Sequence, residues 1–298
     1  MKVAVILMAY GSPTTAEDVP AYLADIRAGR PVSQGAVDEL SERYRRIGGR
    51  SPLDEITEAQ RAALERELLV PVFVGMKHWR PRIAEAVESA LAGGADTLVG
   101  LVLAPHYSQL SIAGYRERLE QALQGRAELV FVESWHDFGP FLDVLADRVR
   151  GFGGHVVFTA HSLPERILRD GDPYRDQLLE TARLVAKRAG LPNDLDHEVG
   201  WSFAFQSASA TGEPWLGPDI LEELDRLAAN GVRRVLVCPV GFVSDHLEIL
   251  WDLDIEARER AAELGLELER IESLNDDPAF LRALAALVRE RLPAEVAP

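Results

Sequence analysis

Short runs of apolar and β-branched residues alternate along the chain with longer segments in which apolar positions recur every three or four residues. The short runs predict β-strands at 3–9, 71–75, 97–104, 128–133, 155–160, 198–203 and 234–239. The longer segments predict amphipathic helices at 16–27, 57–69, 82–92, 114–123, 141–151, 175–189 and 218–229. This alternation is typical of parallel sheets covered by helices, and runs such as "LVGLVLA" indicate strands buried on both faces.

The alternation also repeats itself along the chain. The segment "ESALAGGADTLVGLVLAPHYS" resembles "LDRLAANGVRRVLVCPVGFVS", and "VILMAYGSP" resembles "VVFTAHSLP". We therefore predict an α/β fold of two similar Rossmann-like domains, residues 1–152 and 153–298, with a cleft between them. The boundary falls at "RGFGG", where glycines interrupt the pattern, and a final helix at about 277–292 is a candidate to pack back on the first domain. Ligands in such folds bind beyond the carboxyl ends of the strands.

Charge and cysteine content narrow the functional classes. The chain of 298 residues has a formal net charge of −16, which argues against a nucleic-acid partner and favours a high local concentration of cations. Cys238 is the single cysteine, so internal disulfides and cysteine-rich zinc or iron–sulfur sites are excluded, and a reducing cytoplasm is the expected compartment. The first apolar run leads into "YGSP" and is expected to be a strand rather than a signal peptide.

Several common catalytic motifs are absent from the sequence. There is no G-x-G-x-x-G after the first strand, no G-x-x-x-x-G-K-[ST] and no G-x-S-x-G, which disfavours nucleotide-phosphate binding and serine-hydrolase chemistry. Two polar segments that follow strands remain, "TAHSLPE" with His161 and "SDHLE" with Glu248. The imidazole and the carboxylate would form either an acid/base pair or half of a site for a divalent metal ion.

Glu248 lies in a further predicted helix, "SDHLEILWDLDIE" at 244–256. In an α-helix the carboxylates of Glu248, Asp252 and Glu256 would fall on nearly one face. Like charges at that spacing destabilise a helix by roughly 0.2–0.5 kcal/mol per pair. Two hypotheses stay open for these residues: a solvated acidic face, or a polar track that guides cations or protons to and from Glu248.

Seven motifs together resemble those of the ferrochelatase family, whose members insert ferrous iron into a porphyrin to make haem. They cover almost the whole chain: "LMAYGSP", "RYRRIGGRSPL", "VGMKHWRP", "LAPHYS", "FTAHSLPERILRDGDPY", "PWLGPDI" and "PVGFVSDHLEILWDLDIE". The forms "MKHWRP" and "LAPHYS" are most similar to the soluble bacterial enzymes that use coproporphyrin III. The tail "ESLNDDPAFLRALAALV" is more similar to the protoporphyrin-using forms.

The resemblance implies roles for individual residues. His161 and Glu248 match the pair that handles the metal on one side of the macrocycle, and Tyr10 matches a residue on the other side that can ligate iron in the product. The positions that match porphyrin-binding and propionate-binding residues are Arg27, Arg43, Tyr44, Ser51 and Tyr115. A neutral His161 would act as the base for a pyrrole proton near neutral pH. Glu248 would orient His161, hold its imidazolium form, or take the proton onward through Asp252 and Glu256.

The expected enzyme needs no resident cofactor and no iron–sulfur cluster, because Fe²⁺ is a substrate. It is expected to be a cytoplasmic monomer with transient contacts to neighbouring haem-pathway enzymes. The residues between Tyr10 and Ser51 mix charges throughout and offer no apolar lip for a membrane, so coproporphyrin III is favoured, with Arg27, Arg30 and Arg43 available for its extra propionates. The alternatives are a protoporphyrin IX ferrochelatase, a sirohydrochlorin-type cobaltochelatase and a non-catalytic haem- or metal-binding protein. His78 either lines the cleft or caps a strand.

Overall fold

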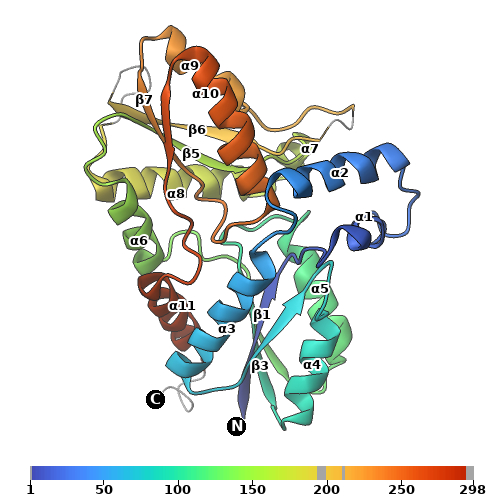
Figure 1. The fold of residues 1–298 in the computed structure, drawn as a ribbon. Helices are drawn as coiled ribbons and strands as arrows, with labels where there is room; N and C mark the ends of the chain where they lie inside the picture. The colour runs from blue at the N-terminus through green and yellow to red at the C-terminus, as the bar shows by residue number, and fades with distance from the viewer. Residues whose placement is uncertain (1, 193–198, 210–211, 293–298) are drawn as a thin grey trace.

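Parallel strands form two four-stranded sheets in the computed structural model, which describes residues 2–192, 199–209 and 212–292 (Figure 1). The first sheet has the order β2–β1–β3–β4, with β1 (Val3–Ala9), β2 (Val72–Met76), β3 (Thr97–Val102) and β4 (Glu128–Val132). The second has the order β6–β5–β7–β8, with β5 (His155–His161), β6 (Gly200–Gln206), β7 (Arg234–Cys238) and β8 (Glu267–Arg270). The equivalent strand order confirms the predicted repetition and the two Rossmann-like units. The domain limits at 152 and 153 stay predictions.

Strand β1 shows why its sequence forms a central strand. All seven residues are buried, and successive side chains point to opposite faces of the sheet. Val3, Val5 and Leu7 join a core with α3, α6 and α11, whereas the residues between them join a core with α4 and α5. These helices are α3 (Leu53–Leu68), α4 (Ile83–Ala92), α5 (Ile112–Leu123), α6 (Gly139–Val149) and α11 (Pro278–Arg291). Each fully buried large apolar side chain contributes about 1.5–3 kcal/mol to folding.

The second sheet is covered in the same way. Helix α8 (Tyr174–Ala189) packs on one face of β5, and α9 (Ile220–Ala229) with α10 (Arg258–Leu264) packs on the other. The core beneath α8 is continuous with the core of the first sheet through α6. Helix α11 contacts α3 and α6, so this helix lies against the first half of the chain (Figure 1).

Some elements have no counterpart among the predicted ranges. They are α2 (Gln34–Arg46), the short helix α7 (Arg166–Arg169), α10 and the edge strand β8. Helix α2 follows α1 (Val19–Ile26), and Ser33 caps it by accepting a hydrogen bond from the backbone N–H of Ala36 at 3.2 Å. None of the helices within the described ranges combines the length and the apolar character that a bilayer crossing needs.

The helix that follows Glu248 differs in type from the predicted α-helix. Residues Ile249–Ala257 form a π-helix, which continues into α10. Hydrogen bonds in a π-helix run between residues five apart, and such helices are rare and frequently lie at functional sites. Ile249 and Leu253 are buried in the core of the second sheet, so the π-helix is packed against the protein rather than exposed. The α-helical spacing assumed for Glu248, Asp252 and Glu256 was therefore wrong.

Candidate active site

His161 and Glu248 meet at the carboxyl end of the second sheet. His161 ends β5, a strand that pairs with both β6 and β7, and Glu248 directly precedes the π-helix. Nε2 of His161 lies 3.4 Å from Oε1 of Glu248, and Nε2 of His246 lies 3.6 Å from Oε2 of Glu248. The side chains of His161 and Glu248 are 31% and 35% exposed, so a substrate can reach both.

The surroundings of His161 set the orientation of its ring. Nδ1 donates a hydrogen bond to the carbonyl oxygen of Ser162, which leaves the lone pair of a neutral ring on Nε2. The hydroxyl of Tyr174 donates to the carbonyl oxygen of His161 at 2.9 Å, and Oγ of Ser162 donates to the carbonyl oxygen of Leu216 at 2.7 Å. These contacts hold the strand end and direct Nε2 toward Glu248.

The pair is ionised in the substrate-free protein. Burial alone would lower the pKa of His161, but the adjacent Glu248 carboxylate raises this pKa to about 9. Burial alone would raise the pKa of Glu248, but His161 and then His246 hold it well below its usual value. At neutral pH the pair is therefore an imidazolium and a carboxylate. The expectation of a neutral His161 near neutral pH is wrong for this state, because the charge of Glu248 outweighs the effect of burial on the pKa of His161.

Asp252 is a buried carboxylate tied to the end of β6. It is 5% exposed and accepts hydrogen bonds from Nε2 of Gln206 at 3.2 Å and from the hydroxyl of Ser207. Ser207 has a φ of 63°, which is uncommon for a residue other than glycine. Burial, followed by the charges of Glu248 and Glu256, raises the pKa of Asp252 to about 6. Asp252 therefore does not belong to a solvated acidic face, and Glu256 is half-buried.

Tyr10 follows β1 in the first half of the chain and is supported by His78. The Tyr10 ring is 42% exposed, and its centre lies 4.6 Å from that of the His78 ring. Nδ1 of His78 donates to Asp25 at 2.8 Å, and Asp25 also pairs with Arg82 at 2.8 Å. Burial lowers the pKa of His78 to about 4, so its ring is neutral. His78 thus packs against the Tyr10 side chain and does not only cap a strand.

Three of the predicted porphyrin-binding side chains are largely buried. Tyr44 and Tyr115 are 3% and 5% exposed, and burial raises the pKa of both phenols. Ser51 is also buried, and its hydroxyl accepts a hydrogen bond from the backbone N–H of Leu53 at 3.2 Å. Nζ of Lys77 lies 4.7 Å from the centre of the Tyr115 ring, a cation–π contact that the sequence analysis did not anticipate.

The two predicted arginines, Arg27 and Arg43, both contact other groups of the protein near its surface. Arg27 is exposed at the end of α1, and its hydrogen bond to the carbonyl oxygen of Pro31 at 3.3 Å stays within its own loop. Arg43 on α2 pairs with Glu39 at 2.8 Å, and its guanidinium lies 5.3 Å from the centre of the Trp251 ring. Since Trp251 belongs to the π-helix, α2 of the first half contacts the segment that follows Glu248.

Two neighbours of the pair were not among the predicted site residues. One is His246, which was part of the quoted "SDHLE", and the other is Trp215, whose ring centre lies 6.5 Å from that of His161. Within the described ranges, no three His, Cys, Asp or Glu side chains are grouped so that they could hold a metal ion together. The predicted metal pair, His161 and Glu248, would therefore offer two ligands rather than a complete coordination shell.

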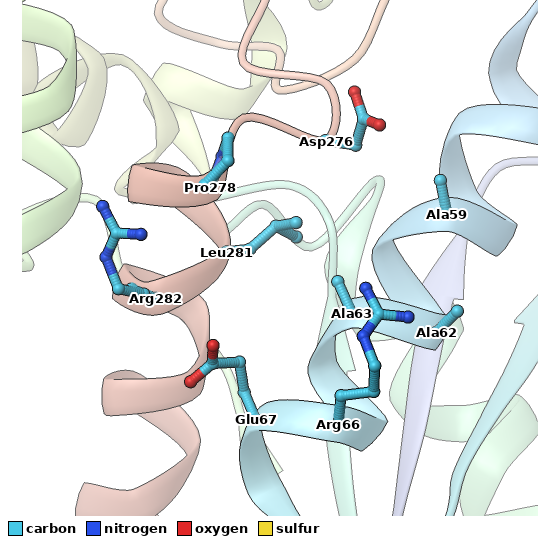
Figure 2. A pocket seen from close by; sticks show the side chains of 9 residues that line it. All are labelled: Ala59, Ala62, Ala63, Arg66, Glu67, Asp276, Pro278, Leu281 and Arg282. Atoms are coloured by element: carbon cyan, nitrogen blue, oxygen red, sulfur yellow. The ribbon is translucent and has the colours of Figure 1, made fainter.

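A cavity of about 370 Å³ lies apart from these residues, between α3 and α11 (Figure 2). Ala59, Ala63 and Leu281 form part of its wall, and Arg66 and Asp276 also line it. None of the predicted site residues lines it. The cavity lies where the last helix packs on the first half of the chain, and we attribute it to incomplete packing of these helices.

Two similar parallel α/β units, with an imidazole–carboxylate pair at the strand ends of the second, define a chelatase-type protein. Similar solved structures include the sirohydrochlorin chelatase SirB from Bacillus subtilis subspecies spizizenii in complex with cobalt. Its TM-score is 0.58 at 12% identity, and the match covers 98% of this chain and 95% of that chain. CbiX, the terminal enzyme of sirohaem biosynthesis in denitrifying bacteria, matches with a TM-score of 0.54 at 13% identity over 98% of this chain and 100% of that chain. These likenesses establish the fold alone.

The chain belongs to the ferrochelatase family, whose profile matches residues 2–292. A ferrochelatase from Deinococcus radiodurans is 45% identical over 98% of this chain and 96% of its own. A coproporphyrin III ferrochelatase from Halalkalibacterium halodurans is 40% identical over 98% of this chain and 97% of its own. The activity is thus that of a lyase that inserts a metal ion into a porphyrin in haem biosynthesis, as the motifs predicted.

Replacing Asp252 by Asn and Glu256 by Gln tests the hypothesis of a polar track. We expect the double variant to bind porphyrin with unchanged affinity but to insert iron roughly tenfold more slowly or to need roughly tenfold more Fe²⁺ for half-maximal rate, as is usual when groups around a metal ligand are altered. Anaerobic initial rates at varied Fe²⁺ and porphyrin fluorescence titrations provide the two measurements. Unchanged iron kinetics together with equal or greater thermal stability would exclude the polar track.

Proposed function

We propose that this ferrochelatase inserts Fe²⁺ into coproporphyrin III, and that His161 and Glu248 handle both the iron and the pyrrole protons. The proposal depends on one observation above others: a reachable imidazole and carboxylate 3.4 Å apart, with the carboxylate ionised. Nitrogen and oxygen donors of this kind suit ferrous iron. The exposed ring of Tyr10, from the first half of the chain, would contact the iron from the opposite side of the macrocycle.

The surface of α1 and α2 favours a substrate with many carboxylates. Arg27 and Arg30 are exposed there and Arg43 is half-buried. The exposed large apolar side chains of the described residues are Tyr10, Leu69, Leu110, Leu168 and Val199, so residues 11–51 contribute none of them. Guanidinium groups bind carboxylates through charge-assisted hydrogen bonds, and coproporphyrin offers more propionates than protoporphyrin. The relative named for coproporphyrin III supports the same choice.

Iron insertion requires the porphyrin to release two pyrrole protons. In the resting pair His161 already holds a proton, because Glu248 raises its pKa to about 9. An Fe²⁺ ion that approaches Glu248 disfavours the imidazolium, so the proton leaves and Nε2 can accept a pyrrole proton. Asp252, whose pKa is raised to about 6 and which is coupled to Glu248, would take each proton in turn toward Glu256 and solvent.

The porphyrin must also be held in a bent shape, because a flat macrocycle hides the lone pairs of its nitrogens from the incoming metal. Contacts to the propionates, remote from the reacting nitrogens, can supply the binding energy for this distortion. Arg27 and Arg43 would hold the propionates, and Tyr44, Ser51 and Tyr115, which are buried in the substrate-free protein, would contact the porphyrin once neighbouring side chains move aside. Arg43 would exchange its contacts with Glu39 and Trp251 for the substrate.

The proposed enzyme uses no resident cofactor and no iron–sulfur cluster, because iron enters as a substrate. It works in the cytoplasm as a monomer and meets neighbouring haem-pathway enzymes transiently. A sirohydrochlorin-type cobaltochelatase is not proposed, because the solved chelatases of that kind share 12% and 13% identity with this chain, against 45% for a ferrochelatase.

Parallel anaerobic assays with coproporphyrin III and protoporphyrin IX test the substrate. Since a hydrogen bond to a charged group contributes about 1.5–3 kcal/mol, we expect kcat/KM to be at least roughly tenfold higher for coproporphyrin III. Assays with Zn²⁺ in place of Fe²⁺ serve as the control, because they report the porphyrin preference without iron oxidation. Faster turnover of protoporphyrin IX with both metals would overturn the proposed substrate.

A further inference from the structure

The guanidinium of Arg270 contacts both ends of the segment that carries the iron-handling residues. Arg270 ends β8, and its side chain is 12% exposed. Its Nε and Nη2 donate to the two carboxylate oxygens of Asp254 at 2.9 and 2.8 Å. Its Nη1 lies 3.2 Å from Oδ1 of Asp245. One side chain therefore bridges Asp245 and Asp254, and residues 245–254 include His246, Glu248 and Asp252.

The Asp245 end of this segment is anchored to the rest of the protein. Oδ1 of Asp245 accepts a hydrogen bond from Oγ of Ser273 at 2.6 Å, and Oδ2 accepts one from Nδ2 of Asn275 at 2.9 Å. The backbone N–H of Asp245 donates to Oδ1 of Asn275 at 2.8 Å. Gln60, which is fully buried on α3, donates to the carbonyl oxygen of Asn275 at 2.7 Å. The loop before Glu248 is thereby tied to the first half of the chain.

The Asp254 end lies within the π-helix, two residues after Asp252. A π-helix of nine residues is unusual, because such helices occur mostly as single turns inside α-helices. The contact between Arg270 and Asp254 is bidentate, and this geometry fixes the direction of a carboxylate as well as its position. Arg270, at the end of β8, thus constrains the part of the π-helix that follows Asp252, whereas Glu248 directly precedes the π-helix.

We propose that Arg270 is a positioning residue, which holds Glu248 and Asp252 in the arrangement needed for iron transfer by fixing both ends of residues 245–254. The inference rests on the proposed role of Glu248 and adds a residue that touches neither iron nor porphyrin. Without Arg270, the carboxylates of Asp245 and Asp254 lose their shared cation and repel each other. The segment between them then relaxes, and Glu248 and Asp252 lose their mutual placement.

The test compares Arg270→Met and Asp254→Asn with a matched control, Arg260→Met. Arg260 on α10 also contacts two carboxylates, those of Asp225 and Glu263 at 2.7 Å each, but both lie outside residues 245–254. Calorimetric titration with Co²⁺, an air-stable substitute for Fe²⁺, measures metal affinity in the porphyrin-free protein. We expect roughly tenfold or greater weakening for Arg270→Met and Asp254→Asn, wild-type affinity for Arg260→Met, and unchanged affinity for coproporphyrin III in all three.

The double variant Arg270→Met/Asp254→Asn should bind Co²⁺ no more weakly than Arg270→Met alone, because both changes remove the same contact. If Arg270→Met does not fold, the isosteric Asp254→Asn provides the same comparison. Co²⁺ affinities within twofold of the Arg260→Met control would overturn the role of Arg270. Glu248→Gln is measured alongside: loss of Co²⁺ binding there with retention in Arg270→Met refutes this inference alone, whereas retention in Glu248→Gln refutes the proposed iron site and this inference together.

Discussion

Replacing His161 with alanine is expected to slow iron insertion into coproporphyrin III by about 10³-fold, within the range that a positioned acid or base contributes to catalysis. The variant loses Nε2, which lies 3.4 Å from Glu248, and so removes a proton acceptor and a metal ligand together. The fold should persist, because the side chain lies at a strand end and is 31% exposed. Anaerobic rate measurements and thermal denaturation monitored by circular dichroism check both expectations.

A second imidazole–carboxylate pair provides the control for this variant. Nε2 of His136 lies 3.1 Å from Glu180, and neither residue is among the predicted site residues. His136→Ala should therefore retain close to wild-type turnover. Near-normal turnover in a folded His161→Ala protein would remove His161 from the mechanism.

Glu248→Gln is expected to reduce iron insertion by roughly 100-fold, the upper range for changes at and around metal sites, and to change the titration of His161 as well. The carboxylate of Glu248 raises the pKa of His161 to about 9, so its removal should return this pKa toward the ordinary value of 6.5. NMR titration of the imidazole in the substrate-free protein measures the change. An unchanged His161 pKa in Glu248→Gln would show that the two groups do not interact as described.

The same variant should alter stability in a defined pH window. Because the pKa of His161 is raised, its pairing stabilises the fold fully below the ordinary value of 6.5 and loses this contribution as the pH rises through about 9. Because the pKa of Glu248 is lowered, its contribution is present above the ordinary value of 4.5 and is lost at lower pH. The difference in unfolding free energy between wild type and Glu248→Gln should therefore be widest from about pH 4.5 to 6.5, which denaturant titrations can measure.

The central strands could be predicted because burial on both faces gives them continuous apolar runs. Strand β1 is buried throughout, and β5 is buried up to His161, so each stands out from its polar flanks. The repeated strand-to-loop pattern also placed Tyr10 and His161 at equivalent strand ends, which the matching strand orders confirm. The positions of these motifs in the sequence thus placed the candidate site at the carboxyl ends of the strands, where parallel sheets bind ligands.

Elements with little buried surface could not be predicted from periodicity. Strand β8 is a four-residue edge strand whose residues alternate between exposed and half-buried. Helix α2 buries Tyr44 alone among its thirteen residues, and its apolar stripe of Val37, Leu40 and Tyr44 is short and lies among charged residues. Arg270 was not predicted because it ends this edge strand and because its partners, Asp254 and Asp245, lie about 16 and 25 residues away in the chain.

The type of the helix after Glu248 and the protonation of the pair depended on tertiary contacts. Apolar residues occupy most positions of "EILWDLDIE", so the pattern lacks the period that would distinguish an α-helix from a π-helix. The burial of Asp252 depends on Gln206, which ends β6, and on Ser207, which follows it. The charge state of His161 depends on its distance to Glu248, which residue spacing alone does not give.

Single-turnover metallation tests the central claim most directly. The protein is loaded with coproporphyrin III and mixed with Fe²⁺ under anaerobic conditions in a stopped-flow instrument, while porphyrin fluorescence is recorded. If His161 and Glu248 insert iron into this porphyrin, wild-type fluorescence should disappear as haem forms, and His161→Ala should bind the porphyrin but remain fluorescent. Persistent fluorescence in the wild-type protein, or equally rapid loss in His161→Ala, would contradict the assignment.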